Sequence, residues 1–291
     1  MVAQTHHDVP CVITARGAGW RETAIDLFRP TTRHDERATY AHLALAPARK
    51  AVVFVHGFAG RALQTWTQFP HLLQGNPKAA DYDLFFYEYD SFTAQVGDIS
   101  FAFARFLKKL AANPAVLVNR GLSLPQQRAA FTYERIVLIA HSLGAVVTRR
   151  LLLDAHTNGE PWVAKTRFVL FAPADRGALR GHLVSEALAG VPFGSLGGAA
   201  IQGAFPAVDQ IKQGGKYLED LRNDTLEVTA NNAAPHLKAA RVLFAEHESV
   251  TLKQKFLLEE KADDIPETTH TSVCKPVDAS NQAVTELLLY L

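Results

Sequence analysis

The sequence contains little cysteine and little methionine, and it has no excess of charge of either sign. Its 291 residues include two cysteines and one methionine, and 30 Lys and Arg side chains balance 29 Asp and Glu. Cys11 and Cys274 lie too far apart for a CxxC metal site and cannot form a disulfide framework, which fits a reducing compartment. A net charge of +1 gives the whole protein no electrostatic reason to bind nucleic acid. We therefore expect no nucleic-acid partner.

The first residues, MVAQTHHDVP, lack the basic and then apolar profile of a secretory signal. No internal repeat and no linker-like change of composition divides the chain. Hydrophobic residues make up 48% of it and charged residues 20%, which supplies a sizeable core and excludes general disorder. We expect residues 1–291 to form a single domain in the cytoplasm.

One long stretch, Ala187–Val208, lacks charged residues altogether. It is long enough to span a bilayer, but glycine, proline and alanine dominate it, and such a segment forms a poor continuous helix. We therefore expect no stable membrane span. A buried helix–loop element and an apolar flap over a site remain as alternatives.

Short apolar segments alternate with helical patterns along most of the chain. Strands are expected at Ala51–Val55, Leu84–Tyr89, Arg135–Ala140, Phe168–Phe171 and Arg241–Ala245, with a weaker one at Thr23–Phe28, and helices at Gly97–Leu110, Ala145–Ala155 and Asn281–Tyr290. Fully apolar strands that alternate with helices are typical of a parallel sheet covered on both faces. The predicted fold class is α/β, with a mostly parallel, doubly wound sheet.

The segment around Ser142, IVLIAHSLGAVV, is the most informative in the chain. A buried strand runs into His141-Ser142, and a helix follows at once. Small residues, Ala140 and Gly144, stand two positions before and after the serine, where bulky neighbours would collide in a sharp strand-to-helix turn. The amide groups at the start of the helix point to the same place. A serine that only caps the helix is the alternative interpretation.

This segment resembles the nucleophile elbow of the α/β-hydrolase family, GxSxG, with Ala140 in place of the first glycine. A second segment, VVFVHGFAG at residues 52–60, resembles the loop of that family that supplies an oxyanion-hole amide. The resemblance implies that Ser142 is the nucleophile and that the amides of Phe58 and Leu143 form the oxyanion hole. We expect His56 of this loop to be a buried structural histidine.

In the same family the base is a histidine that follows the nucleophile and the acid along the chain. His270 stands after the last expected strand and before the terminal helix, which is the place implied for the base. Its segment HTSVCKP resembles a loop of intracellular serine esterases and lipases, including the GPI-inositol-deacylase-like and SERAC-like branches. His6, His7, His34 and His42 precede the first matching strand, and we expect them at the surface.

Three residues are candidates for the acid. Glu248 is followed two positions later by Val250, which resembles the acid-x-valine pattern of the family with glutamate in place of aspartate. Glu246 is its immediate rival. Asp175 follows the preceding strand, and its alternative role is that of a turn aspartate paired with Arg176 at the surface. The sequence favours Glu248 and leaves the other two open.

The resemblance extends from residue 52 to 291 through smaller likenesses such as Thr65-Trp66, whereas residues 1–48 have no clear counterpart. It implies a serine hydrolase that cleaves carboxylic esters through an acyl-Ser142 intermediate, without a cofactor. No HExxH, CxxC or acidic cluster indicates a metal. A non-catalytic binding protein of the same fold is the alternative, as is a thioesterase or acyltransferase with the same triad.

Substrate choice is expected to depend on residues 176–235, an insertion that would form a lid. The charge-free stretch within it offers an apolar acyl groove with four large side chains, Phe193, Leu196, Ile201 and Phe205. We expect an ester with an apolar acyl chain, in a small molecule or a lipid, and transient contact with lipid through the lid. A lid that merely packs over a site for small soluble esters is the simpler alternative.

Overall fold

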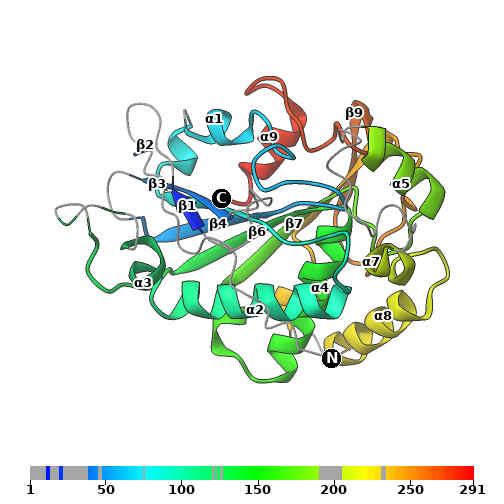
Figure 1. The fold of residues 1–291 in the computed structure, drawn as a ribbon, viewed down its shortest axis with the longest axis horizontal. Coiled ribbons are helices and arrows are strands. Elements are labelled where there is room, and N and C mark those ends of the chain that lie inside the picture. Colours follow the sequence, from blue (N-terminus) through cyan, green and yellow to red (C-terminus); the bar gives the residue numbers. More distant parts are fainter. Residues whose placement is uncertain are drawn as a thin grey trace.

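The computed structural model describes residues 11–13, 20–21, 39–44, 48–74, 76–119, 122, 124, 127–189, 205–230 and 234–291. Within this part of the chain one mixed sheet forms the centre of the molecule (Figure 1). Its strands are β1 (Cys11–Ile13), β2 (Trp20–Arg21), β3 (Thr39–Ala44), β4 (Lys50–Val55), β5 (Tyr82–Tyr87), β6 (Arg135–His141), β7 (Thr166–Phe171), β8 (Arg241–His247) and β9 (Ala262–Thr269).

The strand order is β1-β3-β5-β4-β6-β7-β8-β9, with β2 paired to β3. From β5 to β9 every neighbouring pair is parallel, whereas β3 runs antiparallel to β5. Along the chain the order changes direction at β4, since β5 lies on one side of it and β6 on the other. The predicted mostly parallel, doubly wound sheet is confirmed.

Helices cover both faces of the sheet, as Figure 1 shows, with α1 and α9 on one face and α2 and α4 on the other. The α-helices are α1 (Phe69–Gln74), α2 (Val96–Ala112), α3 (Pro114–Val118), α4 (Leu143–Thr157), α5 (Arg180–Ala189), α7 (Pro206–Gln210), α8 (Lys216–Thr229) and α9 (Gln282–Leu287). Short 3-10 turns are η1 (Pro77–Ala79), η4 (Pro161–Lys165) and η6 (Pro235–Leu237).

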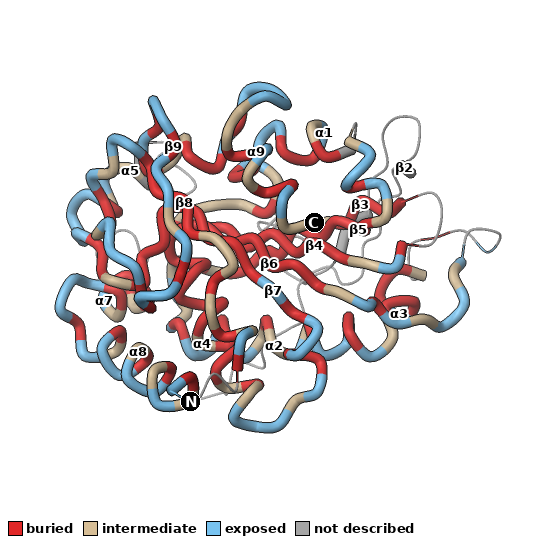
Figure 2. The backbone as a smooth tube through the Cα atoms, turned by 180° about the vertical axis from the view of Figure 1, so that it is seen from behind, coloured by how far each residue is buried: buried red, intermediate tan, exposed pale blue. Residues whose placement is uncertain are grey.

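The sheet separates two apolar cores. Successive side chains of a strand point to opposite faces, so Val53 of β4 joins the core under α2 and α4 and Phe54 joins the core under α1 and α9. The buried face of α2 includes Ile99, Phe103 and Leu107, three to four positions apart, as a helix on one face of a sheet requires. Figure 2 shows that buried backbone concentrates in the central strands.

Most of the expected elements occur where the sequence indicated them, within a few residues. The expected strand Leu84–Tyr89 is displaced and spans Tyr82–Tyr87, because all six of those positions are buried and pair with β4. The terminal helix is shorter than Asn281–Tyr290: Asn281 caps it, with its side chain accepting from the Ala283 amide at 2.9 Å. The weaker expected strand, Thr23–Phe28, lies outside the described residues.

Four strands, β1, β2, β3 and β9, were not expected, and β3 corrects a residue assignment. His42 was expected at the surface, but it lies in β3 and is 8% exposed. It pairs with Leu84 of β5 and lies edge-on to Phe86 at 5.3 Å. Burial, with a smaller contribution from the nearby His71, lowers the pKa of His42 to about 4. Pairing with the distant strand β5 buries this residue, and sequence order does not reveal that pairing.

Strand β9, which was also not expected, has the polar sequence ADDIPETT. It pairs with β8 on one side only, at the edge of the sheet, and among its residues only Ile265 and Thr268 are buried. An exposed edge strand needs no continuous apolar run, so hydrophobic periodicity does not report it.

Candidate active site

Ser142 lies in the sharp turn between β6 and α4. Its backbone has φ 52° and ψ −119°, a left-handed conformation that is costly for a residue other than glycine. Three backbone hydrogen bonds hold it there. The Ser142 amide donates to the Phe171 carbonyl at 3.0 Å, and the amides of Ala145 and Ala174 donate to the Ser142 carbonyl at 3.0 and 3.2 Å. The turn is therefore anchored to the end of β7 and to the helix that follows it.

Two glycines allow the chain to pack closely around this turn. A Cβ atom on Gly144 would lie 2.4 Å from the His56 carbonyl oxygen, and one on Gly57 would lie 2.9 Å from the Cβ atom of Ser142. Both distances are too short for a side chain, so glycine is required at these positions. Ala140, by contrast, is fully buried in β6 opposite Val55, and its methyl group fits there.

A chain of hydrogen bonds joins Ser142, His270 and Glu248. His270 Nε2 lies 3.0 Å from Ser142 Oγ, and His270 Nδ1 lies 3.1 Å from each carboxylate oxygen of Glu248. With Nδ1 protonated, the imidazole donates to the carboxylate and accepts from the hydroxyl. Ser142 is 1% exposed and His270 is 2% exposed, so the arrangement is shielded from solvent.

The carboxyl group of Glu248 is fully buried, with 0% of its side chain exposed. Burial would raise its pKa, but the hydrogen bond and charge of His270 and the amides of Thr251 and Val250 outweigh burial, and the pKa of Glu248 lies below its ordinary value. Those amides donate to Oε1 at 3.0 and 2.8 Å. The carboxylate is thus held ionised and oriented toward the imidazole.

Of the two rival acids, Glu246 is exposed on β8 and accepts a hydrogen bond from the Glu267 amide at 2.8 Å. It contacts the neighbouring strand β9, and no hydrogen bond joins it to His270 within the described residues.

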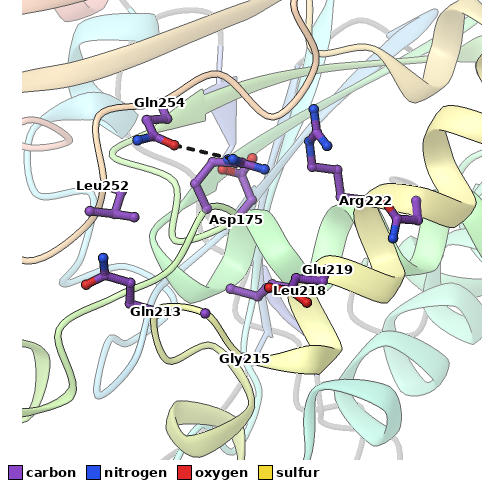
Figure 3. Close-up of a pocket in the computed structure, with 11 residues that line it drawn as sticks. Asp175, Gln213, Gly215, Leu218, Glu219, Arg222, Leu252 and Gln254 are labelled. Carbon is purple, nitrogen blue, oxygen red and sulfur yellow. Dashed lines mark hydrogen bonds between the residues drawn. The ribbon is translucent and has the colours of Figure 1, made fainter.

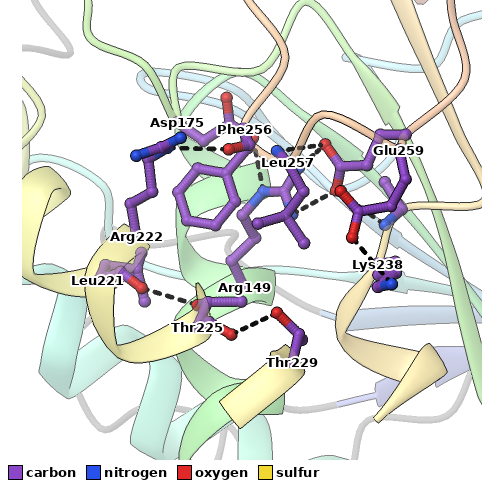
Figure 4. A network of polar contacts seen from close by, with 12 residues as sticks. Arg149, Asp175, Leu221, Arg222, Thr225, Thr229, Lys238, Phe256, Leu257 and Glu259 are labelled. Carbon is purple, nitrogen blue, oxygen red and sulfur yellow. Dashed lines mark hydrogen bonds and ion pairs between the residues drawn. The ribbon is translucent and has the colours of Figure 1, made fainter. Parts of the chain in front are cut away.

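Asp175 was described, in its alternative role, as a surface aspartate paired with Arg176, and this is wrong. Its side chain is 1% exposed and pairs with Arg149 of α4 at 2.5 Å. Arg149, which Figure 4 shows beside Asp175, also donates to both oxygens of Glu260, at 2.8 and 3.0 Å. Asp175 therefore belongs to a buried charge cluster, and no hydrogen bond among the described residues joins it to His270. Spacing along the chain could not show this, because the three residues come from separate elements.

The amides expected to form the oxyanion hole are those of Phe58 and Leu143. Phe58 follows β4 by three residues, and Leu143 is the first residue of α4. Neither amide donates a hydrogen bond to any group of the described residues. An amide at the start of a helix has no acceptor within that helix, and an amide that binds an oxyanion must likewise be free to donate. Both residues are buried.

His56, which precedes Gly57, is buried as expected. Its Nδ1 donates to the Gly57 carbonyl at 2.8 Å, and its ring stacks on Tyr89 with centroids 4.1 Å apart. The Tyr89 hydroxyl donates to the His56 carbonyl at 2.6 Å. These contacts hold the loop that carries the Phe58 amide.

His141, the residue before the serine, was not among the expected site residues. It is buried, and its Nε2 donates to the backbone carbonyl of His270 at 2.8 Å. Burial, and then the nearby His270, lower the pKa of His141 to about 3, so the ring is neutral at physiological pH. In the sequence, only the position of His141 within the AxSxG segment distinguishes it. That position does not predict the hydrogen bond to the His270 carbonyl.

Of the four expected groove residues, Phe193, Leu196 and Ile201 lie outside the described residues. Phe205 is buried and packs edge-on against Phe58, with ring centroids 5.1 Å apart. The ring centroid of Phe92 lies 5.2 Å from that of Phe58 and 6.1 Å from that of Phe205. The end of the charge-free stretch is therefore attached to the loop that carries the Phe58 amide.

In the described part of the chain, no helix is both long and apolar enough to cross a membrane, and no group of three or more His, Cys, Asp or Glu side chains could hold a metal ion.

No protein-family model and no curated protein sequence matches this chain. Solved structures do match it. Phospholipase PlaB from Legionella pneumophila is 16% identical with a TM-score of 0.56, over 83% of this chain and 59% of that chain. Lipase BlEst2 from Bacillus licheniformis is 16% identical with a TM-score of 0.52, over 86% and 97%. A structure from work on carboxylesterases of Nitrososphaera gargenis is 11% identical with a TM-score of 0.50, over 87% and 92%.

The sheet order, the strand–turn–helix at Ser142 and these structural matches define an α/β-hydrolase fold. The chain is similar in fold to lipases and esterases, and it spans about three-fifths of the PlaB chain that it matches.

Proposed function

We propose that this protein is a serine hydrolase that cleaves carboxylic esters through an acyl-Ser142 intermediate. The observation that carries the proposal is the unbroken series of hydrogen bonds from Ser142 through His270 to Glu248, built on a left-handed serine between a strand and a helix. The fold similarity to lipases and esterases supports the same reaction class.

In the first half of the reaction, Ser142 Oγ attacks the ester carbonyl carbon while His270 Nε2 takes the hydroxyl proton. Glu248 stabilises the imidazolium that forms, because its carboxylate already faces Nδ1 at 3.1 Å. The amides of Phe58 and Leu143 bind the developing oxyanion, and each such donor contributes about 3 kcal/mol in comparable sites.

In the second half, His270 gives its proton to the leaving alcohol, and the alcohol departs. A water then attacks the acyl-Ser142 carbonyl carbon, and His270 takes a proton from that water. Collapse of the second tetrahedral intermediate returns the proton to Ser142 Oγ and releases the carboxylic acid. Each group is restored at the end of the cycle, so no cofactor is needed.

We assign an apolar acyl chain to the substrate, in a small ester or a lipid. The support is the charge-free stretch 187–208, whose Phe205 reaches Phe58 beside the proposed oxyanion hole. Ser142 is 1% exposed, so a substrate must displace part of its cover before it can react. Residues 176–235 would be that lid within a single domain of residues 1–291, and they would make any transient contact with a lipid surface.

The likeness of the His270 segment to the GPI-inositol-deacylase-like and SERAC-like branches supports placing the chain near those intracellular esterases, with a cytoplasmic location. Thioesterase and acyltransferase reactions use the same acyl-serine intermediate. The substrate panel of the test therefore includes a thioester and an acceptor alcohol.

The test compares wild type with Ser142→Ala on p-nitrophenyl esters from butyrate to palmitate. We expect wild type to hydrolyse them and Ser142→Ala to lose at least about a thousandfold in kcat, because a triad without its nucleophile retains only binding and oxyanion contributions. Equal rates in both proteins, or no turnover of any ester or thioester by wild type, would leave a non-catalytic binding protein as the conclusion. Preference for butyrate over all longer esters would contradict the apolar acyl groove.

A further inference from the structure

A cleft of about 530 Å³ lies between the turn after β7, the start of α8 and the segment after β8 (Figure 3). Its volume falls in the range of sites for small molecules. None of Ser142, His270 or Glu248 lines it. The residues that carry its chemistry are Asp175, Arg176, Gln213, Glu219, Arg222 and Gln254.

Neither of the two arginines in this cleft forms a close ion pair with a carboxylate of the described residues, although the charge of Arg176 lowers the pKa of its neighbour Asp175. Arg176 donates through one terminal nitrogen to Gln254 Oε1 at 3.3 Å, and its Nε is buried without a hydrogen bond there. Arg222 donates Nε to the Phe256 carbonyl at 3.0 Å, which orients the guanidinium and leaves its two terminal nitrogens for another acceptor. Guanidinium groups held in this way are suited to bind a carboxylate or a phosphate.

The N-terminus of a helix lies on the same wall. Gly214 and Gly215 line the cleft, and Gly215 is the N-cap of α8, a helix of 14 residues, with no side chain capping its first amides. The partial positive charge at a helix N-terminus favours an anionic group in this position.

The cleft also carries negative charge. Asp175 lines it, and its Oδ2 is paired with Arg149, but its Oδ1 is buried without a partner among the described residues. Arg149 is also paired with Glu260, so one guanidinium is shared by two carboxylates. Glu219 lines the cleft as well. A simple anion would meet Asp175 and Glu219, and a simple cation would meet the two arginines.

We propose that this cleft binds a small zwitterion, in which a phosphate or carboxylate group is joined by a short linker to an ammonium group. Arg176 and Arg222 bind the anionic end, and the partial positive charge at the N-terminus of α8 favours it there. Asp175 Oδ1 and Glu219 accept from the ammonium end, which gives the unpartnered oxygen a donor. Figure 3 shows Gln213 and Gln254 on one side of the cleft and Glu219 and Arg222 on the other, so the amide side chains can bind the linker region from the opposite wall.

Isothermal titration of the full chain with three probes tests the proposal. The probes are O-phosphoethanolamine, inorganic phosphate and ethanolamine, so that the two charged groups are offered together and apart. We expect O-phosphoethanolamine to bind at least about tenfold more tightly than phosphate, and ethanolamine to bind most weakly, since each charge-assisted hydrogen bond that is lost weakens binding about tenfold or more.

Variants locate the site. Arg176→Gln and Arg222→Gln should each weaken O-phosphoethanolamine binding about tenfold or more, whereas Lys212→Gln, an exposed neighbour that does not line the cleft, should not. Circular dichroism of each variant shows that it is folded. Binding should be unchanged in Ser142→Ala, so the result is independent of the proposed esterase activity.

Two further arms identify the source of the ligand. Binding of β-alanine supports a free carboxylate zwitterion, and co-sedimentation with phosphatidylethanolamine vesicles that Arg222→Gln abolishes supports a lipid headgroup. The proposal is overturned if no probe binds at millimolar concentration, if phosphate binds as tightly as O-phosphoethanolamine, or if Lys212→Gln weakens binding as much as the arginine variants.

Discussion

The strained serine is held by three backbone hydrogen bonds. Its amide is bound to the end of β7, and its carbonyl accepts from Ala145 in α4 and from Ala174 beyond β7. These bonds compensate for a left-handed conformation that costs about 1–3 kcal/mol. Strain of this kind persists only where the surroundings hold it, so the geometry of Ser142 depends on neighbours that take no part in the proposed chemistry.

The acid is tested by a matched pair of variants. Glu248→Gln should lower kcat by about 10²–10⁴-fold, because an amide cannot stabilise the imidazolium and can stabilise the wrong tautomer of His270. Glu246→Gln should stay near wild type, since that side chain is exposed and contacts the Glu267 amide. The measurement is kcat on one p-nitrophenyl ester. A large loss in Glu246→Gln with little change in Glu248→Gln would reverse the assignment.

We expect the His141 side chain to position the base, His270, by binding the backbone carbonyl of that residue. Its Nε2 donates to the His270 carbonyl, so His141→Phe removes a buried donor and leaves that carbonyl unpaired. We expect a fall in kcat of about tenfold with little change in KM, since the imidazole is displaced while the binding surface is kept.

His141→Gln, whose amide can donate to the same carbonyl, should recover part of the loss in kcat. Equal kcat values in the two variants, or a change confined to KM, would show that the residue only fills space.

At the residue scale, the sequence predicts contacts between residues that are close together in the chain. It predicts contacts between side chains of separate elements less well. Ser142 could be singled out because the small residues around it are adjacent in the chain. Asp175 could not be placed, because its partner Arg149 is on α4 and Glu260 follows β8. The bond between His141 and His270 crosses from one strand end to another and leaves no spacing pattern.

At the scale of elements, the close approach of α4 to the end of β4 depends on a single glycine. Gly144→Ala would place a Cβ atom 2.4 Å from the His56 carbonyl oxygen, so the helix must shift, and we expect a loss of at least about 2 kcal/mol in the free energy of unfolding. Urea denaturation measures it.

Gly97→Ala in α2 is the control. No atom lies within 4 Å of a Cβ atom there, and the substitution should stabilise the protein by about 0.5–1 kcal/mol because alanine favours the helix. The same loss in both variants would mean that glycine is required for reasons other than the contact with β4.

The central strands and the helices between them were predictable because burial on two faces demands an uninterrupted apolar run. β4, β6 and β7 are such runs. The edge strand β9 faces solvent over most of its length and contains Pro266, so neither periodicity nor composition reports it. Strands and helices of the core can therefore be predicted from this sequence. Strands at the edge of the sheet cannot, because they form through pairing with a neighbouring strand.

At the scale of the whole molecule, buried histidines make stability depend on pH. The pKa values of His42 and His141 are lowered to about 4 and about 3, whereas in the unfolded chain a histidine has a pKa of about 6.5. As pH falls below about 6.5, the unfolded chain takes up protons that the folded protein does not, so the free energy of unfolding falls by up to about 1.4 kcal/mol per pH unit for each histidine.

Urea denaturation between about pH 7.5 and about pH 5 should show this decrease, by at most about 4 kcal/mol for both groups. The raised pKa of Asp175, caused by its burial, acts in the opposite direction at lower pH, and the lowered pKa of Glu248 adds to the loss there. His42→Leu should flatten the profile, whereas a substitution of the exposed His247 should not. A pH-independent free energy of unfolding over this interval would contradict the prediction.

The three side chains of the proposed triad follow β6, β8 and β9, and the Phe58 amide follows β4. The chain between β7 and β8 supplies none of them. In evolutionary terms, the segment proposed as a lid can therefore be exchanged, lengthened or lost in a descendant while the residues proposed for catalysis are inherited unchanged. Proteins that share this sheet can then diverge in substrate while they keep the same reaction.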